Sequence, residues 1–126
     1  MLRNEKGFTL IEIIAVLVIL GILAAVAIPK YLSMMDSSRI AAAQGAIAEC
    51  KSRASGYYAN ELLTGLTPTG ALVLASMTAN GGPNVGSDFT VSAAQTGTSD
   101  ILITVSAVKS VTLTSNVIGT WYFPTS

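Results

Sequence analysis

The sequence predicts an α+β protein in which one long N-terminal helix packs on a small antiparallel sheet of three or four strands. Three observations lead to this prediction. A run of mostly apolar residues covers 8–28, an amphipathic pattern of helical period follows it without a loop, and after residue 87 short segments of β-forming residues alternate. At 126 residues with 11% charged side chains, the chain has room for one small globular unit beside the apolar run.

The apolar run, Phe8 to Ile28, is long enough to cross a membrane. Its 21 residues span roughly 31 Å as a helix, which matches the hydrocarbon core of a bilayer at about 30 Å. Arg3 and Lys6 outweigh Glu5 ahead of it, so the positive-inside tendency predicts a cytoplasmic N-terminus and an exported C-terminal part. Its one charge, Glu12, is costly inside lipid and is therefore a candidate functional residue.

Two residues weaken this segment as a helix. Gly21 costs up to about 1 kcal/mol in a helix interior, and Pro29 removes a backbone donor and disfavours helical geometry at Ile28. Two interpretations stay open. Either neighbouring contacts keep the segment helical with a kink, or the segment melts or extends during function.

A second helical pattern runs from Lys30 to about Tyr58. Apolar residues recur there at steps of three and four, and most charged residues fall off that stripe. The stripe consists of Ile40, Ala43, Ile47, Cys50, Ala54 and Tyr57 or Tyr58. No loop composition separates this pattern from the apolar run, so we expect one continuous helix of about 50 residues.

The rest of the chain predicts a short helix and then the sheet. Turn formers punctuate it, and alternation of apolar with polar residues marks the strands. The expected elements are a connection at Gly65, Pro68 and Gly70, a short helix at 71–79 and a turn at 80–84. The expected strands are 89–93, 101–108, 111–114 and 117–123, with Ser115-Asn116 as the turn between the last two.

Composition argues against enzyme and nucleic-acid functions. The chain has no histidine, which removes His-based triads and most zinc sites, and its net charge of zero gives no footprint for nucleic acid. Asp88 and Asp100 are too isolated to supply the six to eight oxygen ligands of calcium. The sequence therefore predicts no enzyme, no cofactor and no metal site. The single cysteine, Cys50, is interpreted as a small buried hydrophobe, with a cross-linking thiol as the alternative.

The N-terminal segment resembles a known processing signal. In K-G-F-T-L-I-E, Gly7 precedes Phe8, Thr9 follows, and Glu12 is the fifth residue counted from Phe8. The apolar helix then ends in A-I-P-K-Y. This pattern, from Lys6 to Tyr31, is similar to the class III signal of bacterial type IV pilins and of the related pseudopilins of type II secretion. The resemblance implies the pilin fold and a helical homopolymer.

The resemblance also implies roles for single residues. A prepilin peptidase would remove residues 1–7 as a leader by cutting between Gly7 and Phe8, and would methylate the new amine of Phe8. Glu12, accompanied by Thr9, would pair with the Phe8 amine of a neighbouring subunit and set its register. A pair within one chain and a tolerated interfacial charge are the alternatives for Glu12.

The same resemblance implies a division of the chain and a set of partners. Residues 8–29 would be the membrane and filament-core helix, and residues 30–126 the globular domain. Gly21 and Pro29 fall where the family's helix loosens when subunits pack. The implied partners are further copies of the chain, prepilin peptidase, the inner-membrane pilus assembly machinery and, before assembly, membrane lipid.

The expected function is that of a structural subunit of a type IV pilus, in the inner membrane before assembly and outside the cell afterwards. Whether the fibre serves adhesion, motility or DNA uptake stays open. The chief alternative is a type II secretion pseudopilin. A protein exported by cleavage after Ala27 is another, because Ala25-Val26-Ala27 fits a signal-peptidase site. A plain single-pass anchor, which would keep Met1, is the third.

Overall fold

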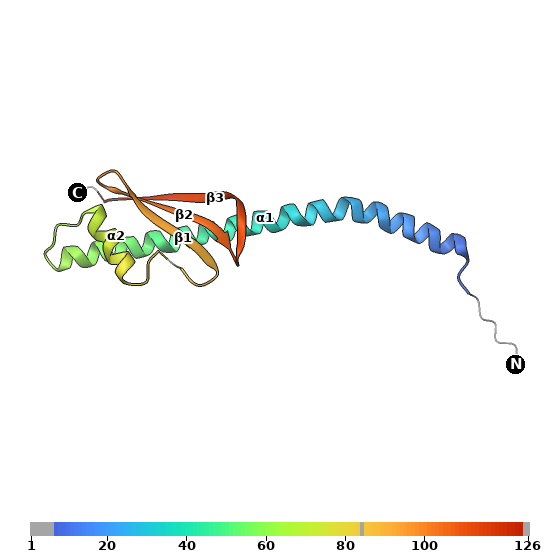
Figure 1. Cartoon of the computed structure of the whole chain (residues 1–126), viewed down its shortest axis with the longest axis horizontal. Helices are drawn as coiled ribbons and strands as arrows, with labels where there is room; N and C mark the ends of the chain where they lie inside the picture. The colour runs from blue at the N-terminus through green and yellow to red at the C-terminus, as the bar shows by residue number, and fades with distance from the viewer. Residues whose placement is uncertain (1–6, 84, 125–126) are drawn as a thin grey trace, which may run out of the picture. The chain divides into compact units, whose positions relative to one another are not determined.

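The structure is a computed structural model that describes residues 7–83 and 85–124. Two helices precede three strands along the chain (Figure 1). The elements are α1 (Leu10–Leu63), α2 (Gly70–Ala79), β1 (Phe89–Thr96), β2 (Asp100–Val108) and β3 (Val111–Tyr122). The chain divides into two compact units, Met1–Asp36 and Ser37–Ser126. The expected α+β layout is confirmed, and the predicted leader lies outside the described residues except for Gly7.

The first unit consists of the apolar part of α1. Its described side chains up to Met34 are all exposed. The helix is long and apolar enough there to cross a membrane, and no part of that window is buried. It continues through Gly21 and Pro29 without a break, so the predicted continuity is confirmed in the single subunit.

In the second unit, α1 buries one stripe of residues that recur at helical spacing. The buried members are Ala43, Ala46, Ile47, Cys50, Ala54 and Glu61. The predicted stripe is therefore confirmed from Ala43 onward. Ile40 is an exception, with 40% of its surface exposed, because the core begins one turn later along the helix.

The end of α1 was predicted five residues too early. The helix passes Tyr58 and ends at Leu63, because Glu61 continues the buried stripe. Gly65 then stops it in the left-handed region, at φ 77°. The amide of Leu66 donates to the carbonyl of Glu61 at 3.0 Å, and the amide of Gly65 donates to Leu62 at 3.1 Å. This is a Schellman ending, for which glycine is the usual residue.

The sheet is antiparallel, with strand order β1-β2-β3. The prediction of a turn at Ser115-Asn116 between two strands is wrong, because β3 is one strand. Val117 pairs with Val105 and Thr112 pairs with Ala107, so residues 113–116 oppose Ser106 and form an irregularity instead of reversing the chain.

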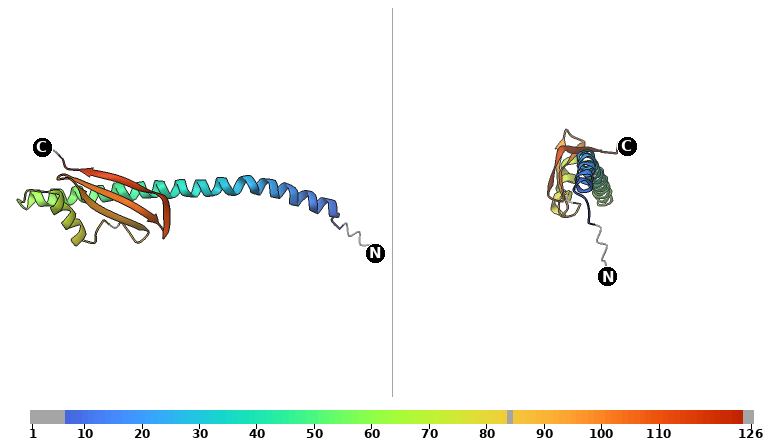
Figure 2. Two further views of the ribbon diagram at one scale, coloured as in Figure 1. Left: turned by 45° about the horizontal axis from the view of Figure 1, so that its top comes forward. Right: turned by 90° about the vertical axis from the view of Figure 1, so that its right-hand side faces the viewer.

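The core of the second unit lies between the sheet and the two helices. Figure 2 shows the sheet on one side of the C-terminal part of α1, with α2 beside it. Alternate residues of β2 point into this core. The largest fully buried side chains are Met77, Ile101, Ile103, Val73, Val105 and Cys50.

Candidate functional site

Thr9 and Glu12 together form the start of α1. The amide nitrogen and the hydroxyl oxygen of Thr9 both donate hydrogen bonds to Oε2 of Glu12, each at 2.8 Å. The amides of Glu12 and Ile13 donate in turn to the carbonyl of Thr9, at 3.1 and 3.3 Å. The sequence Thr9-Leu10-Ile11-Glu12 is a capping-box pattern, in which the carboxyl group binds back to the residue that immediately precedes the helix.

This geometry supplies Glu12 with partners from its own chain. From the sequence we expected Glu12 to pair with a cation, because a buried carboxyl group needs one. The apolar run itself contains no cation. The donors found are instead two neutral groups of one residue, and both bind Oε2. Within residues 7–83 and 85–124, no hydrogen bond to Oε1 is present. The T-x-x-E spacing is the sequence signal that would have predicted this contact.

The predicted cleavage position lies just outside the helix. Gly7, Phe8 and Thr9 precede the first helical residue and are exposed, with 84% of the surface of Phe8 accessible. Exposed non-helical backbone is what a peptidase needs to reach a peptide bond. Thr9 and Glu12 are thus in contact, and Phe8 adjoins them in the sequence.

Gly21 and Pro29 lie further along the same helix and do not join this cluster. Nothing lies within 4 Å of a Cβ atom built at Gly21. The single subunit therefore gives no packing reason for a glycine at that position. Any such reason must come from a neighbour, or from a need for a weak helix.

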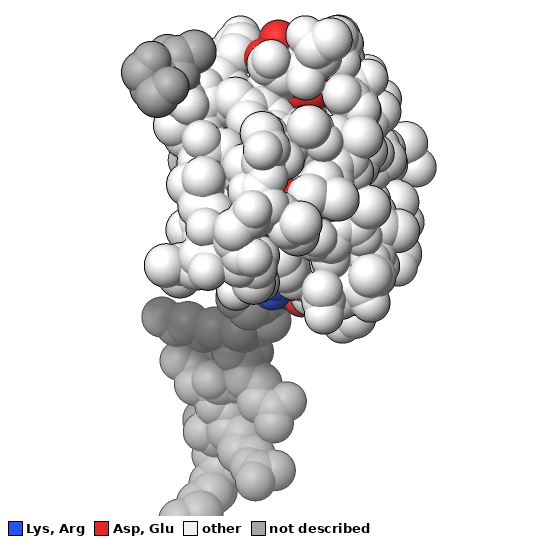
Figure 3. Space-filling model, turned by 90° about the vertical axis from the view of Figure 1, so that its left-hand side faces the viewer, with Lys and Arg blue, Asp and Glu red and all other residues white. Residues whose placement is uncertain are grey.

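Charged side chains are sparse in the second unit. Residues 37–126 contain four basic and four acidic side chains, and Arg53 pairs with Glu49 at 2.9 Å on the surface of α1. Among the described residues, no group of three or more potential metal ligands gathers. Figure 3 shows one end of this unit, where most of the visible described surface carries no charge.

Cys50 and Glu61 are buried side chains with polar atoms in the described part of the second unit, and the sequence predicted the burial of Cys50. Cys50 is fully buried and its thiol donates to the carbonyl of Pro83 at 2.9 Å, which confirms its interpretation as a core residue. Glu61 was not anticipated. It is 5% exposed, Ser76 Oγ donates to its Oε1 at 3.0 Å, and its Oε2 has no hydrogen-bond partner among the described residues.

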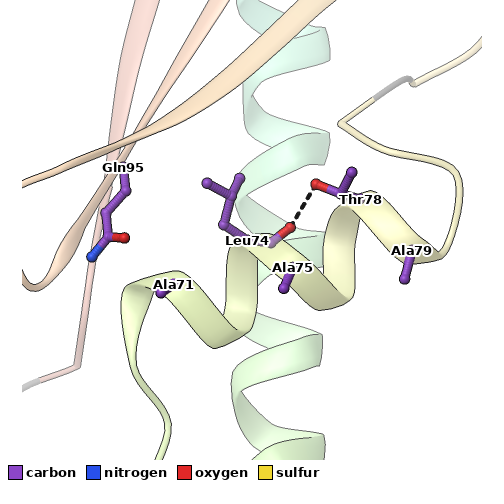
Figure 4. A pocket seen from close by; sticks show the side chains of 6 residues that line it. All are labelled: Ala71, Leu74, Ala75, Thr78, Ala79 and Gln95. Carbon is purple, nitrogen blue, oxygen red and sulfur yellow. Dashed lines mark hydrogen bonds between the residues drawn. The ribbon is translucent and has the colours of Figure 1, made fainter.

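The outer face of α2 carries a shallow apolar depression (Figure 4). Small side chains line most of it. The hydroxyl of Thr78, the polar group on the helix side, donates to the carbonyl of Leu74 at 2.8 Å. Gln95 of β1 is the other polar side chain of the lining, so the depression presents little chemistry for catalysis.

Comparisons with known proteins agree with the N-terminal geometry. Residues 2–28 match the family described as "Prokaryotic N-terminal methylation motif". The chain is 51% identical over 45 residues to "Type II secretion system core protein G" of Pseudomonas aeruginosa, covering 36% of this chain and 32% of that protein. It is 35% identical over 69 residues to a "Fimbrial protein" of Pseudomonas aeruginosa, covering 53% of this chain and 45% of the relative.

A third relative is "Type IV major alpha-pilin" of Moraxella bovis. The identity is 42% over 50 residues, which are 40% of this chain and 31% of the relative. The matched segment is thus about a third to just under a half of each relative's length. No solved structure matches the chain significantly. The chain carries the type IV pilin signal, and its named relatives are pilins, fimbrial proteins and a secretion-system core protein.

Proposed function

We propose that this chain is the structural subunit of a type IV pilus and that its activity is polymerisation through the apolar half of α1. One observation supports this most directly. The first unit exposes apolar side chains on every side, yet it holds one carboxyl group in a defined geometry at its start. Lipid covers that surface before assembly, and the same surface of other copies covers it afterwards.

The free energy for this exchange cannot come from the hydrophobic effect, because lipid tails are as apolar as the helix. Association of helices out of lipid depends instead on close packing and on polar contacts between them. Glu12 is the one charged side chain in the run from Phe8 to Ile28. It is therefore the group on which the position of a neighbouring subunit can depend.

Cleavage between Gly7 and Phe8 supplies the partner of Glu12. It creates an amine at Phe8, which the peptidase methylates and which remains cationic. Thr9 holds Oε2 of Glu12, so Oε1 is the atom available to the amine of a neighbour. A subunit placed out of register would leave both charges unpaired in an apolar core, which is strongly unfavourable.

Gly21 and Pro29 provide the adjustment that packing requires. In the single subunit the helix is continuous through both residues, but each weakens it. We expect this segment to loosen when copies pack, with neighbouring helices satisfying the freed backbone groups.

The N-terminus of the mature protein tests this function most directly. Mass spectrometry of the membrane-extracted chain is expected to find a sequence that begins at Phe8 with one additional methyl group. A chain that begins at Ile28 would show export by signal-peptidase cleavage. A chain that keeps Met1 would show a plain anchor. Either of the last two results would overturn the proposal.

A variant of Glu12 tests the assembly role. Glu12→Ala is expected to be processed and inserted normally but to form no fibres visible by electron microscopy, and Glu12→Gln is expected to form few. Glu49→Ala is the matched control, because it removes an exposed carboxyl group of the second unit and should leave fibres unchanged. Normal fibres from Glu12→Ala would exclude the role given to this residue.

A type II secretion pseudopilin is the second candidate, favoured by the 51% identity to a secretion-system core protein over 45 residues. Deletion of the chain separates the two functions. Loss of surface fibres with unchanged protein secretion indicates a pilus subunit, and accumulation of normally secreted proteins in the periplasm indicates a pseudopilin.

A further inference from the structure

The outer face of the sheet is the face opposite to the core. Alternate residues of a strand point to opposite faces, and paired residues on neighbouring strands share a face. Ile101 and Trp121 are buried in the core. Asp100 and Tyr122, which adjoin them in sequence and pair with each other, therefore lie on the outer face.

One row of this face crosses all three strands. Thr96 of β1 pairs with Asp100 of β2, which pairs with Tyr122 of β3. Tyr122 is 68% exposed. Within the described residues, neither the Asp100 carboxyl group nor the Tyr122 hydroxyl takes part in a hydrogen bond or ion pair. An acceptor, an aromatic ring and a hydroxyl group are thus presented side by side on a rigid surface.

The neighbouring rows continue this surface with hydroxyl and aliphatic groups. Leu102 pairs with Thr120 in the second row, and Thr104 pairs with Ile118 in the third. Strand spacing and residue rise make the three rows a patch of roughly 10 by 14 Å. The patch lies on one face of the sheet, and it mixes apolar with hydroxyl-bearing side chains.

The charge of the patch restricts what can bind there. These three rows contain no lysine or arginine, and Asp100 is their one charged residue. Nucleic acids, phosphorylated surfaces and sulfated polymers need cationic side chains, and a carboxylate repels them. Polyanions are therefore excluded, and a neutral polymer that donates hydrogen bonds can satisfy both the carboxylate and the hydroxyl groups of the patch.

We propose that the row Thr96, Asp100 and Tyr122 binds neutral polysaccharide. A pyranose ring has an apolar face of C–H groups, which fits the exposed ring of Tyr122, and a rim of hydroxyl groups. A carboxylate accepts hydrogen bonds from such hydroxyls, and bonds to an ionised acceptor are the stronger kind. Thr96 and Thr120 can donate to or accept from the next ring of the chain.

A single shallow patch binds weakly, so many copies must act together. Effective concentration raises the affinity of linked sites without any new contact. Repetition along a pilus would provide this, and that step rests on the proposed function. The binding chemistry itself does not, because any array of the full chain should show it.

Vesicles test the proposal independently of pilus assembly. The full chain is placed at high density in phosphatidylcholine vesicles with a fluorescent lipid, which are then sedimented with cellulose, chitin or dextran-sulfate particles. Retention of the wild-type vesicles on at least one neutral polymer, and not on dextran sulfate, is expected. Tyr122→Ala should lower retention about tenfold, as loss of an aromatic anchor does, and Asp100→Asn should lower it severalfold.

Two matched variants control for folding and for charge. Tyr122→Phe keeps the ring and should retain most of the binding. Asp88→Asn removes an exposed acid outside the patch and should leave binding unchanged.

Each of the following results would overturn the proposal. These are retention equal to that of protein-free vesicles on both neutral polymers, retention on dextran sulfate alone, and equal retention of Tyr122→Ala, Asp100→Asn and the wild type. The vesicles could also adhere to each other without polymer and lose this adhesion with Tyr122→Ala. That result would show that a second copy of the chain covers the patch, and it would overturn the proposal as well. A normal fibre phenotype with no retention would separate failure of this proposal from failure of the proposed function.

Discussion

Trp121 on β3 donates a hydrogen bond from its indole nitrogen to the hydroxyl oxygen of Ser55 on α1, at 2.9 Å. The same hydroxyl donates to the carbonyl of Lys51 at 3.1 Å. Trp121 is 6% exposed, and its indole ring meets the rings of Tyr58 and Phe123 edge-on, at centroid distances of 6.0 and 5.0 Å. This contact fixes the last strand of the sheet to the second half of the long helix.

Ser55→Ala removes the acceptor of this indole hydrogen bond. We expect the free energy of unfolding to fall by about 1 kcal/mol, as for a hydrogen bond whose buried partner is left unpaired. Denaturant titration followed by fluorescence measures it, because Trp121 is the one tryptophan of the chain. Ser52→Ala, an exposed serine on the same helix, should change stability by less than about 0.5 kcal/mol. Equal values for the two variants would contradict the expectation.

Gly119 allows β3 to approach α1 closely. A Cβ atom built there would overlap with Cγ2 of Ile47 and lie 3.2 Å from Cε of Lys51. Gly119→Ala is therefore expected to lower the free energy of unfolding by about 1–3 kcal/mol, as overpacking does. Gly56→Ala is the control, because nothing lies within 4 Å of a Cβ there and alanine favours a helix. A stable Gly119→Ala variant would show that α1 and β3 separate easily.

Ser76 is the residue through which α2 binds the buried carboxyl group of Glu61. Ser76→Ala leaves Glu61 without the donor at 3.0 Å and should destabilise the second unit by about 1–3 kcal/mol. Ser92→Ala on the exposed face of β1 is the matched control, and thermal unfolding followed by circular dichroism compares them. A neutral Ser76→Ala would mean that water reaches Glu61 in solution.

Because its thiol is buried, Cys50 is expected to make the folded chain less stable in alkaline solution. Burial raises the pKa of its thiol, with Glu49 raising it further and Arg53 opposing the effect. Because the folded pKa exceeds the unfolded one, the unfolded chain loses this proton first, so the contribution to stability is complete below the ordinary thiol pKa of about 8.5 and declines above it. The free energy of unfolding of the wild type should therefore fall between pH 7.5 and 9.5. Cys50→Ala, which has no thiol, should show a smaller fall over the same range. Denaturant titrations at both pH values measure it, and an identical decline in both proteins would contradict it.

Much of the fold could be predicted because the spacing of apolar residues along the sequence agrees with the spacing of buried residues in the structure. The stripe from Ala43 to Ala54 predicts the contact face of α1, and alternation predicts β2. The turn at Ser115-Asn116 was wrong because these residues favour turns locally, whereas their conformation is decided by pairing with β2. Val117 opposite Val105 and Thr112 opposite Ala107 are contacts across strands, which a local pattern does not contain.

The contacts of the candidate sites and of the buried Glu61 divide in a similar way. The contact between Thr9 and Glu12 is readable from four consecutive residues, as a T-x-x-E pattern. The burial of Glu61 could also be found, because it lies seven residues after Ala54 on the same helical stripe. The row of Asp100 and Tyr122 could not, because its members come together only through strand register.

The sparse charge of residues 37–126 has a consequence for how fibres would behave in suspension. With four basic and four acidic side chains, this surface lacks the net charge that keeps proteins apart in water. Fibres built from this chain would approach one another with almost no electrostatic barrier. We therefore expect the fibres to associate side by side into bundles. Short-range contacts, which salt screens little, would hold these bundles together.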